Sequence, residues 1–387
     1  MKKIQLLCLC AALLQYAAMA WAGGPLYTNR DCTPVVFPAS AMPIPYAVDQ
    51  GELGDFSNSL AAGIVDDCFG VWQSVPTASI SFKNAGFLPE DVNETNYEPY
   101  FDSDADRVSP VIFDSDGGII DDVYGYGASD YIIGFSGSAI DYDASGGWYY
   151  TEGLTLINGR FTGLFTPAVF KATFVHEFGH FIGLDHSQIN LPYVSDDNTT
   201  NDMYIPTMFP TSTDDDTPLG ELNPDDEAAL TMLYPAEGSD AAYGRIRGTL
   251  YWRSGLPARG ANIVAVKQGD ERMSQFSSVS DYCMQGDGSF EMLVTPGTYS
   301  FFVEPVYPLF TGGSSVGPYA DTALSASFVF PVRAADYEET LTIAAGETKE
   351  IELFARRNWL RPVPGLAANL LQLLKNLGLI SASGTEL

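Results

Sequence analysis

Histidine and basic residues are scarce in this sequence. Its 387 residues include three histidines, and 19 lysines and arginines stand against 49 aspartates and glutamates, for a net charge of −30. This imbalance excludes nucleic acid as a partner, because the phosphates would be repelled. An acidic surface instead favours solubility and the binding of cations.

The sequence also lacks an apolar run long enough to cross a bilayer. Its N-terminal run, Ile4 to Ala18, follows Lys2 and Lys3 and precedes Ala20-Trp21-Ala22. These features are typical of a secretory signal peptide, so we predict cleavage near Ala22 and a mature chain that begins at Gly23. The alternative, a membrane anchor, needs a longer apolar core. We therefore expect a secreted protein, extracellular or periplasmic, with no membrane span in the mature chain.

Cysteine is equally sparse. Cys8 and Cys10 lie in the signal peptide, which leaves Cys32, Cys68 and Cys283. An exported protein meets an oxidising compartment, where we expect one pair and one free thiol. Cys68 lies on the apolar face of the first predicted helix, and Cys32 comes just before the strand that should pack on that helix. We therefore predict a Cys32–Cys68 disulfide, with Cys283 free and buried.

The mature chain divides into two parts that differ in their sequence patterns. The first part mixes strand and helix patterns, whereas Gly248 to Tyr299 alternates short β runs with glycine and proline turns, as in a β-sandwich. We predict an α+β protein with a signal peptide over 1–22, an α+β domain over 23–235, a linker over 236–242, a small all-β sandwich over 243–355 and a C-terminal helical tail over 356–387, with one helix around Leu366 to Leu377.

Hydrophobic periodicity predicts the elements of the first domain. An apolar residue recurs every four positions from Phe56 to Trp72, which indicates a helix. Thr166-Pro167 is typical of a helix start, and this second helix should run to about Ile182. Asn223-Pro224-Asp225-Asp226 opens a third helix, with acids in its positive first turn. The predicted strands are Ile44–Val48, Ala78–Phe82, Tyr131–Phe135 and Leu154–Ile157.

All three histidines fall in one segment, His176-Glu177-Phe178-Gly179-His180-Phe181-Ile182-Gly183-Leu184-Asp185-His186. His176 and His180 are four positions apart on the predicted helix, so both imidazoles project from one face. Gly183 can adopt a positive φ, which lets the chain leave the helix and return His186 as a third ligand. This pattern predicts a Zn²⁺ site with three nitrogen ligands and an open fourth position for water.

Glu177 follows the first ligand and is the predicted general base. Zinc lowers the pKa of its bound water, and Glu177 takes the proton and later passes it to the leaving amine of a cleaved peptide. Two other interpretations remain open: a binding or adhesion protein that uses the domain as a scaffold, and a structural zinc site. A scaffold has no chemical use for Glu177, and a structural site is usually closed by a fourth ligand.

The histidine segment resembles the signature of the metzincin zinc endopeptidases, and His186-Ser187 is most similar to the matrixin branch. Tyr204 to Pro210 resembles the methionine turn of that family, with Met208 as its methionine. Asn223 to Pro235 resembles the C-terminal matrixin helix. The resemblance covers Ile44 to Pro235. It implies a twisted mixed sheet over the active-site helix and a cleft for a protein or peptide substrate.

The front of the chain departs from the matrixin pattern. Matrixins often carry a long pro-domain with a cysteine switch, whereas little chain here separates the signal peptide from the first predicted strand. Arg30-Asp31-Cys32 resembles a switch, but Thr33-Pro34 does not match it. The alternative to the disulfide is therefore a Cys32 thiolate that blocks the zinc. The resemblance also implies that Leu154–Ile157 is the edge strand that pairs with substrate.

Acidic residues surround a glycine turn in the first domain. Asp114, Asp116, Asp121 and Asp122 offer the hard oxygen ligands that Ca²⁺ prefers, although the segment is not an EF-hand. The segment is either a calcium site or a solvated acidic turn. Further ligands for such a site would be Asp102, Asp104 and Asp106.

The second part of the chain resembles a carboxypeptidase-regulatory-like β-sandwich. We find no catalytic set there, so its expected role is structural or the docking of a partner. All assigned chemistry lies before Tyr234, and we expect a chain that ends near Gly238 to remain active on small peptides. The resemblance is carried by Gly248, Gly255-Leu256-Pro257, Gly260-Ala261, Gly286-Asp287-Gly288-Ser289-Phe290 and Pro296-Gly297-Thr298-Tyr299.

Overall fold

The structure is a computed structural model that describes residues 24–101, 108–196, 198–211, 213, 217–306, 332–333, 335–336 and 340–357. The predicted signal peptide, the three acids Asp102, Asp104 and Asp106, and the predicted helix around Leu366 to Leu377 lie outside these residues. Among the helices that are described, none is both long and apolar enough to span a membrane.

A five-stranded mixed sheet forms the centre of the first part. The strand order is β2-β1-β3-β5-β4, in which the first four strands run parallel and β4 pairs antiparallel with β5 at the edge. The strands are β1 (Ile44–Val48), β2 (Phe82–Phe87), β3 (Ser109–Asp114), β4 (Gly134–Tyr142) and β5 (Trp148–Asn158). All six residues of β3 are buried, as expected for a strand inside a parallel sheet.

Two long helices, α2 (Asn58–Gln73) and α5 (Pro167–Phe181), pack together. Thr166 caps the start of α5 by accepting a hydrogen bond from Val169 N, with proline at the first helical position. Phe69 and Phe178 stack with their ring centroids 3.8 Å apart. Trp72 donates its indole N–H to Val175 O at 2.8 Å. These contacts fix α5 in the hydrophobic core, where burying each large aromatic side chain contributes about 1.5–3 kcal/mol.

The other helices in the described residues are short. The α-helices are α3 (Glu98–Phe101), α4 (Gly118–Tyr124) and α6 (Pro224–Leu233). The 3₁₀ helices are η1 (Ala39–Ala41), η2 (Ala128–Asp130), η3 (Gly159–Gly163), η4 (Leu191–Ser195), η5 (Asp202–Tyr204), η6 (Thr217–Gly220) and η7 (Ser239–Ala241).

The residues after η7 form two further sheets that share one core. One sheet has the order β12-β10-β7-β8, with β13 also paired to β10, and the other has the order β11-β14-β6-β9. Apolar side chains from both sheets, such as Ile246, Ile263 and Phe290, belong to one buried cluster, so the two sheets form a β-sandwich. Its strands are β6 (Gly244–Trp252), β7 (Ala261–Lys267), β8 (Gln275–Val279), β9 (Ser289–Val294), β10 (Gly297–Pro305), β11 (Val332–Arg333), β12 (Ala335–Asp336), β13 (Leu341–Ile343) and β14 (Thr348–Arg357).

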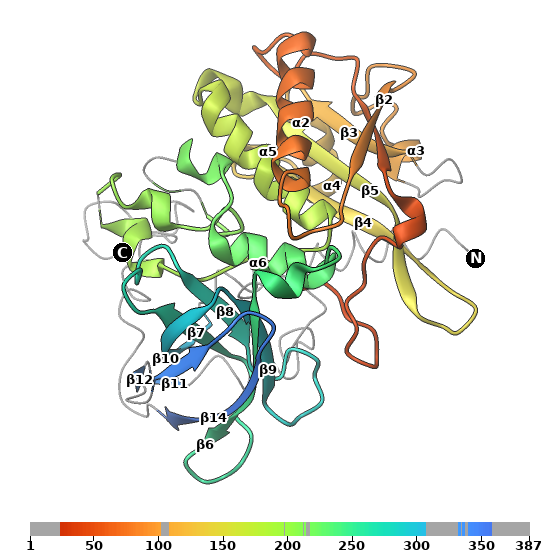
Figure 1. Cartoon of the computed structure of the whole chain (residues 1–387). Coiled ribbons are helices and arrows are strands. Elements are labelled where there is room, and N and C mark those ends of the chain that lie inside the picture. Colours follow the sequence, from red (N-terminus) through yellow and green to blue (C-terminus); the bar gives the residue numbers. More distant parts are fainter. Residues whose placement is uncertain are drawn as a thin grey trace.

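Helix α6 lies between the sheet-and-helix part and the β-sandwich (Figure 1). Its Leu230 belongs to the core that contains α2 and α5, whereas its Ala228 belongs to the core of the sandwich. One short helix therefore contributes to two cores, and the two parts of the chain are packed against each other through it.

The structure confirms the mixture of helices and several sheets and corrects some strands. Ile44–Val48 is a strand as predicted, but the strand predicted at Ala78–Phe82 begins only at Phe82. Leu154–Ile157 lies within β5, between β3 and β4, so its prediction as the edge strand is wrong. The edge strand is β4, because an apolar run alone does not tell whether a strand is central or peripheral.

Candidate metal centre

The three histidines converge as predicted. His176 and His180 lie on α5, and His186 returns after the helix ends. Their candidate ligand atoms all lie within 4.8 Å of one another, and His180 Nε2 and His186 Nε2 are 3.0 Å apart. The described residues contain no other group of three or more histidine, cysteine or acidic side chains with such spacing.

Gly183 makes the return of His186 possible. Its φ is +90°, and a Cβ at this position would stand 2.6 Å from Cε2 of Tyr150, so both conformation and space favour glycine. The N-terminal segment supports the same turn from outside. Leu26 N donates to Gly183 O at 2.7 Å, and Asp185 N donates to Gly24 O at 2.9 Å. Tyr150 and the N-terminal segment therefore both contact the turn between His180 and His186.

Hydrogen bonds orient two of the three imidazoles. His176 Nδ1 lies 2.8 Å from Thr207 O, and His180 Nδ1 lies 2.9 Å from Leu184 O. A carbonyl only accepts, so each Nδ1 carries the proton and each Nε2 presents a lone pair. At 3.0 Å, the Nε2 atoms of His180 and His186 need a proton or a cation between them. The donor set fits a metal ion.

The surroundings keep the histidines neutral. Burial is the largest cause of a lowered pKa at each of them, to about 3 for His180 and well below the ordinary value for His186. Each side chain is nevertheless only partly covered, so solvent reaches the cluster. Neutral imidazoles that solvent can reach are able to bind a divalent cation.

Glu177 lies beside the first histidine and is 8% exposed. Burial raises its pKa from 4.5 to about 8. A Cβ built on Gly134, the first residue of β4, would lie 3.5 Å from Cγ of Glu177. The side chain of Glu177 therefore lies near the start of the edge strand β4.

Met208, the methionine of the predicted turn, lies against α5. A Cβ built on Gly179 would stand 2.1 Å from Met208 Sδ. Asp226 of α6 accepts from Thr207 N at 2.9 Å and from Met208 N at 3.1 Å. The same carboxylate also accepts from Asn223 N at 2.9 Å as part of a capping box. The turn that orients His176 is thus held by a buried carboxylate.

Sequence reasoning missed the roles of Gly179, Thr207 and Asp226. It interpreted Asp225 and Asp226 only as favourable charges in the first turn of a helix. Both are almost fully buried, at 3% and 1% exposure. A pair of acids after Asn-Pro is typical of an exposed helix start, so no local signal could have revealed that these carboxylates bind backbone and hydroxyl groups of other segments.

The predicted calcium ligands are not brought together as a group. Asp114 uses its two oxygens to accept from Ile119 N and Ile120 N, at 3.1 and 2.9 Å. The other acids accept hydrogen bonds elsewhere: Asp116 from Gly118 N, Asp121 from Ser129 N and Asp122 from the Tyr97 hydroxyl. These contacts stabilise α4 and its surroundings, and calcium binding stays an untested prediction.

The predicted disulfide is wrong. Cys32 is bonded to Cys283, across a sequence separation of 251 residues, and within the described part of the chain Cys68 is the free, buried cysteine. Cys68 Sγ points to Lys171 O on α5, at 3.5 Å, rather than toward the N-terminal segment. The prediction failed because it assumed that the two parts of the chain do not meet. The bond also leaves Cys32 without a thiolate that could block a metal.

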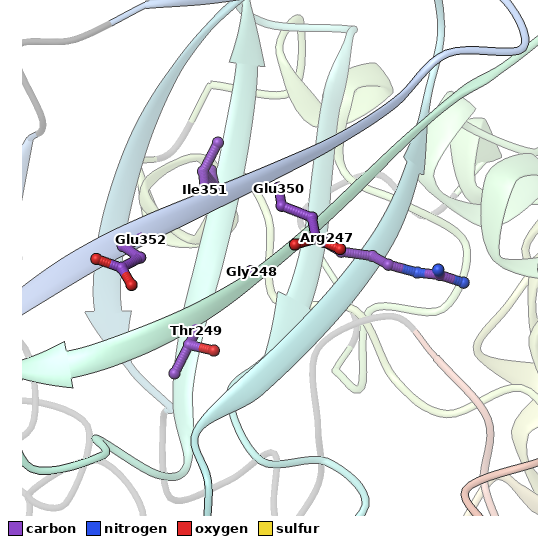
Figure 2. Close-up of a pocket in the computed structure, with 6 residues that line it drawn as sticks. All are labelled: Arg247, Gly248, Thr249, Glu350, Ile351 and Glu352. Atoms are coloured by element: carbon purple, nitrogen blue, oxygen red, sulfur yellow. The ribbon is translucent and has the colours of Figure 1, made fainter.

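A separate hollow of about 450 Å³ lies on the β-sandwich (Figure 2). It is lined by Arg247, Gly248, Thr249, Glu350, Ile351 and Glu352, from the paired strands β6 and β14. None of the predicted site residues lines it.

Comparisons with known proteins give no family for the chain. No protein-family profile matches it, and no curated protein matches it. Among solved structures, a DUF3823 family protein from Parabacteroides merdae is similar over 30% of this chain and 47% of its own, at 16% identity and TM-score 0.18. An (S)-allantoin synthase covers 30% and 42% at 13% identity and TM-score 0.19, and phospholipase PlaB from Legionella pneumophila covers 32% and 30% at 14% identity and TM-score 0.19. The chain thus spans less than half the length of each of these proteins.

Proposed function

We propose that this chain is an exported zinc-dependent endopeptidase of the metzincin type, similar to matrixins. The observation that carries the proposal is the convergence of His176, His180 and His186, with the buried residue Glu177 directly after the first of them. Histidine nitrogens suit several transition metals. Zinc is favoured because three protein ligands with no cysteine among them are typical of catalytic zinc sites that keep an open position.

Each residue has a defined task in this proposal. The three histidines would hold the ion. Zinc bound in this way supplies Lewis-acid activation of water and of the peptide carbonyl. Glu177 accepts the proton of the attacking water and delivers it to the leaving amine.

The position of β4 at the edge of the sheet favours an extended peptide as the substrate. β4 is the outermost strand next to β5, and its first residue, Gly134, lies beside Glu177. An unpaired strand edge can bind an extended peptide through main-chain hydrogen bonds. A peptide paired with β4 would run past Gly134 and so place a carbonyl near Glu177.

Two observations support export. The sequence begins with a pattern typical of a signal peptide. The Cys32–Cys283 disulfide is the kind of bond that persists in oxidising compartments.

The proposal is tested by incubating the purified mature protein with a peptide library, with a zinc chelator and after zinc is restored. We expect cleavage that the chelator abolishes and that one equivalent of zinc restores. Cleavage that persists in a protein shown to be free of metal would contradict the proposal, as would a zinc-loaded protein that cleaves no peptide.

A further inference from the structure

We propose that the β-sandwich holds the third histidine in place, and that Ser277 on β8 is a positioning residue for His186. This inference rests on the proposed function, because it concerns the same metal site. It gives the sandwich a role that requires no external partner. The contacts that carry it begin at Ser187, directly after His186.

The central contact is a shared carboxylate. Asp225, at the start of α6, accepts from Ser187 Oγ at 2.5 Å. The same carboxylate accepts from Ser277 N at 2.9 Å and from Ser277 Oγ at 3.2 Å. Ser187 is 1% exposed and Ser277 is 5% exposed. The residue that follows the third histidine is therefore connected to a sandwich strand through one buried acceptor.

The next residues along the chain repeat this pattern. Gln188 Nε2 donates to Glu304 Oε1 at 2.9 Å and to Pro305 O at 3.1 Å, both on β10. Asn190 accepts from Gln275 Nε2 on β8 at 2.9 Å and donates to Arg272 O at 2.9 Å. Within four positions of His186, Gln188 and Asn190 thus bind the sandwich directly, and Ser187 is connected to it through Asp225.

An apolar cluster extends the same interface to the methionine turn. Ile205 and Phe209, on either side of Met208, share a buried cluster with Val279 of β8 and with Val306. All four side chains are at most 6% exposed. The sandwich therefore packs against both segments that approach α5 from outside.

The first two histidines and the third differ in the structure that positions them. His176 and His180 lie on α5, most of whose buried apolar residues belong to the first core, although its Ala172 shares the cluster with Val279 and Val306. His186 lies on an irregular segment whose following residues are held by the sandwich. Loosening the sandwich should therefore displace the third ligand more than the first two. A chain that ends near Gly238 would lack the sandwich and therefore these contacts. The expectation that such a chain remains active on small peptides did not consider them.

The test compares single substitutions in the full-length mature protein. Ser277→Ala removes one hydrogen bond to Asp225. Ser278→Ala is the matched control, because Ser278 is the next residue of β8, is 4% exposed and belongs to the same strand. Asp225→Asn alters the shared acceptor, and Ser277→Thr keeps the hydroxyl. Each protein is measured for its rate of zinc loss to a chelator, its visible spectrum with Co²⁺ and its melting temperature without metal.

We expect zinc loss to be about tenfold faster in Ser277→Ala, in the range known for residues that orient metal ligands. Asp225→Asn should change it at least as much, Ser277→Thr should restore retention, and Ser278→Ala should behave as wild type. The Co²⁺ spectrum should change in Ser277→Ala and Asp225→Asn only. The melting temperatures show whether a variant has lost its fold rather than its ligand geometry.

Unchanged zinc retention in Ser277→Ala would overturn the inference, whatever Asp225→Asn does. Equal losses in Ser277→Ala and Ser278→Ala would also overturn it, since they would indicate a general loosening of β8. Both results leave the proposed function standing. A wild-type protein that binds no zinc would instead contradict the proposed function itself.

Discussion

Gly179 lies directly against the sulfur of Met208. A Cβ on Gly179 would stand 2.1 Å from Met208 Sδ and 3.0 Å from Cζ2 of Trp72. Gly179 is on α5 between His176 and His180, so the absence of a side chain there lets the methionine turn approach the helix that bears both histidines. The main-chain carbonyl before Met208, on Thr207, is the one that orients His176.

We predict that Gly179→Ala destabilises the metal-free protein by about 1–3 kcal/mol, because Met208 must move to accommodate the methyl group. Gly70→Ala is the control: Gly70 lies in α2 with no atom within 4 Å of a built Cβ, so alanine should stabilise by about 0.5–1 kcal/mol. Urea unfolding curves measure both. Equal stability of Gly179→Ala and wild type would show that this contact is not tight.

The Cys32–Cys283 disulfide can be tested without an activity assay. Mass spectrometry of the unreduced protein should find a peptide that links Cys32 to Cys283, with Cys68 as the free thiol. Cys283→Ser should lower the free energy of unfolding by about 2–4 kcal/mol, as for other bonds that close long loops. Cys68 should react with a thiol reagent only after unfolding, because it is fully buried. A Cys32–Cys68 peptide would contradict the structure.

The raised pKa of Glu304 predicts the direction in which the stability of the folded protein changes with pH. Burial raises its pKa above the ordinary 4.5, although Gln188 and Asn262 donate hydrogen bonds to it. The folded protein therefore keeps this proton at pH values where the unfolded chain has lost it. The stability that this carboxyl contributes is present below about pH 4.5 and is lost as pH rises through the raised pKa.

Glu304→Gln keeps the Oε1 acceptor and removes the titration. We therefore expect the variant to be more stable than wild type near pH 7, with a difference that shrinks toward about pH 4. Thermal unfolding across this range measures it, and Glu350→Gln removes an exposed acid from the same domain as a control. A variant that is less stable than wild type near pH 7 would contradict the sign.

The residues that form the metal centre could be predicted because their signal is local. The spacing of His176 and His180 and the glycine at 183 depend on helix geometry and backbone freedom, which neighbouring residues determine. The start of α5 followed from Thr166-Pro167 in the same way. For the same reason the prediction of Ile44–Val48 as a strand is confirmed.

The contacts between distant segments could not be predicted. The Cys32–Cys283 bond and the two hydrogen bonds of Ser277 to Asp225 each join residues from different parts of the chain. Nothing in the periodicity of β8 shows that one of its serines faces α6. The predicted division into two domains follows the change in composition along the chain. It did not predict that the two parts pack against each other.

The most direct measurement is the parallel determination of zinc content and peptide hydrolysis in Glu177→Gln, with His186→Ala beside it. Glutamine keeps the size of Glu177 but cannot accept the proton, so zinc content should match wild type while hydrolysis falls by a factor of about 10²–10⁴. His186→Ala should lose both, because it removes a ligand. A Glu177→Gln protein that holds zinc and cleaves peptides at the wild-type rate would contradict the proposed mechanism.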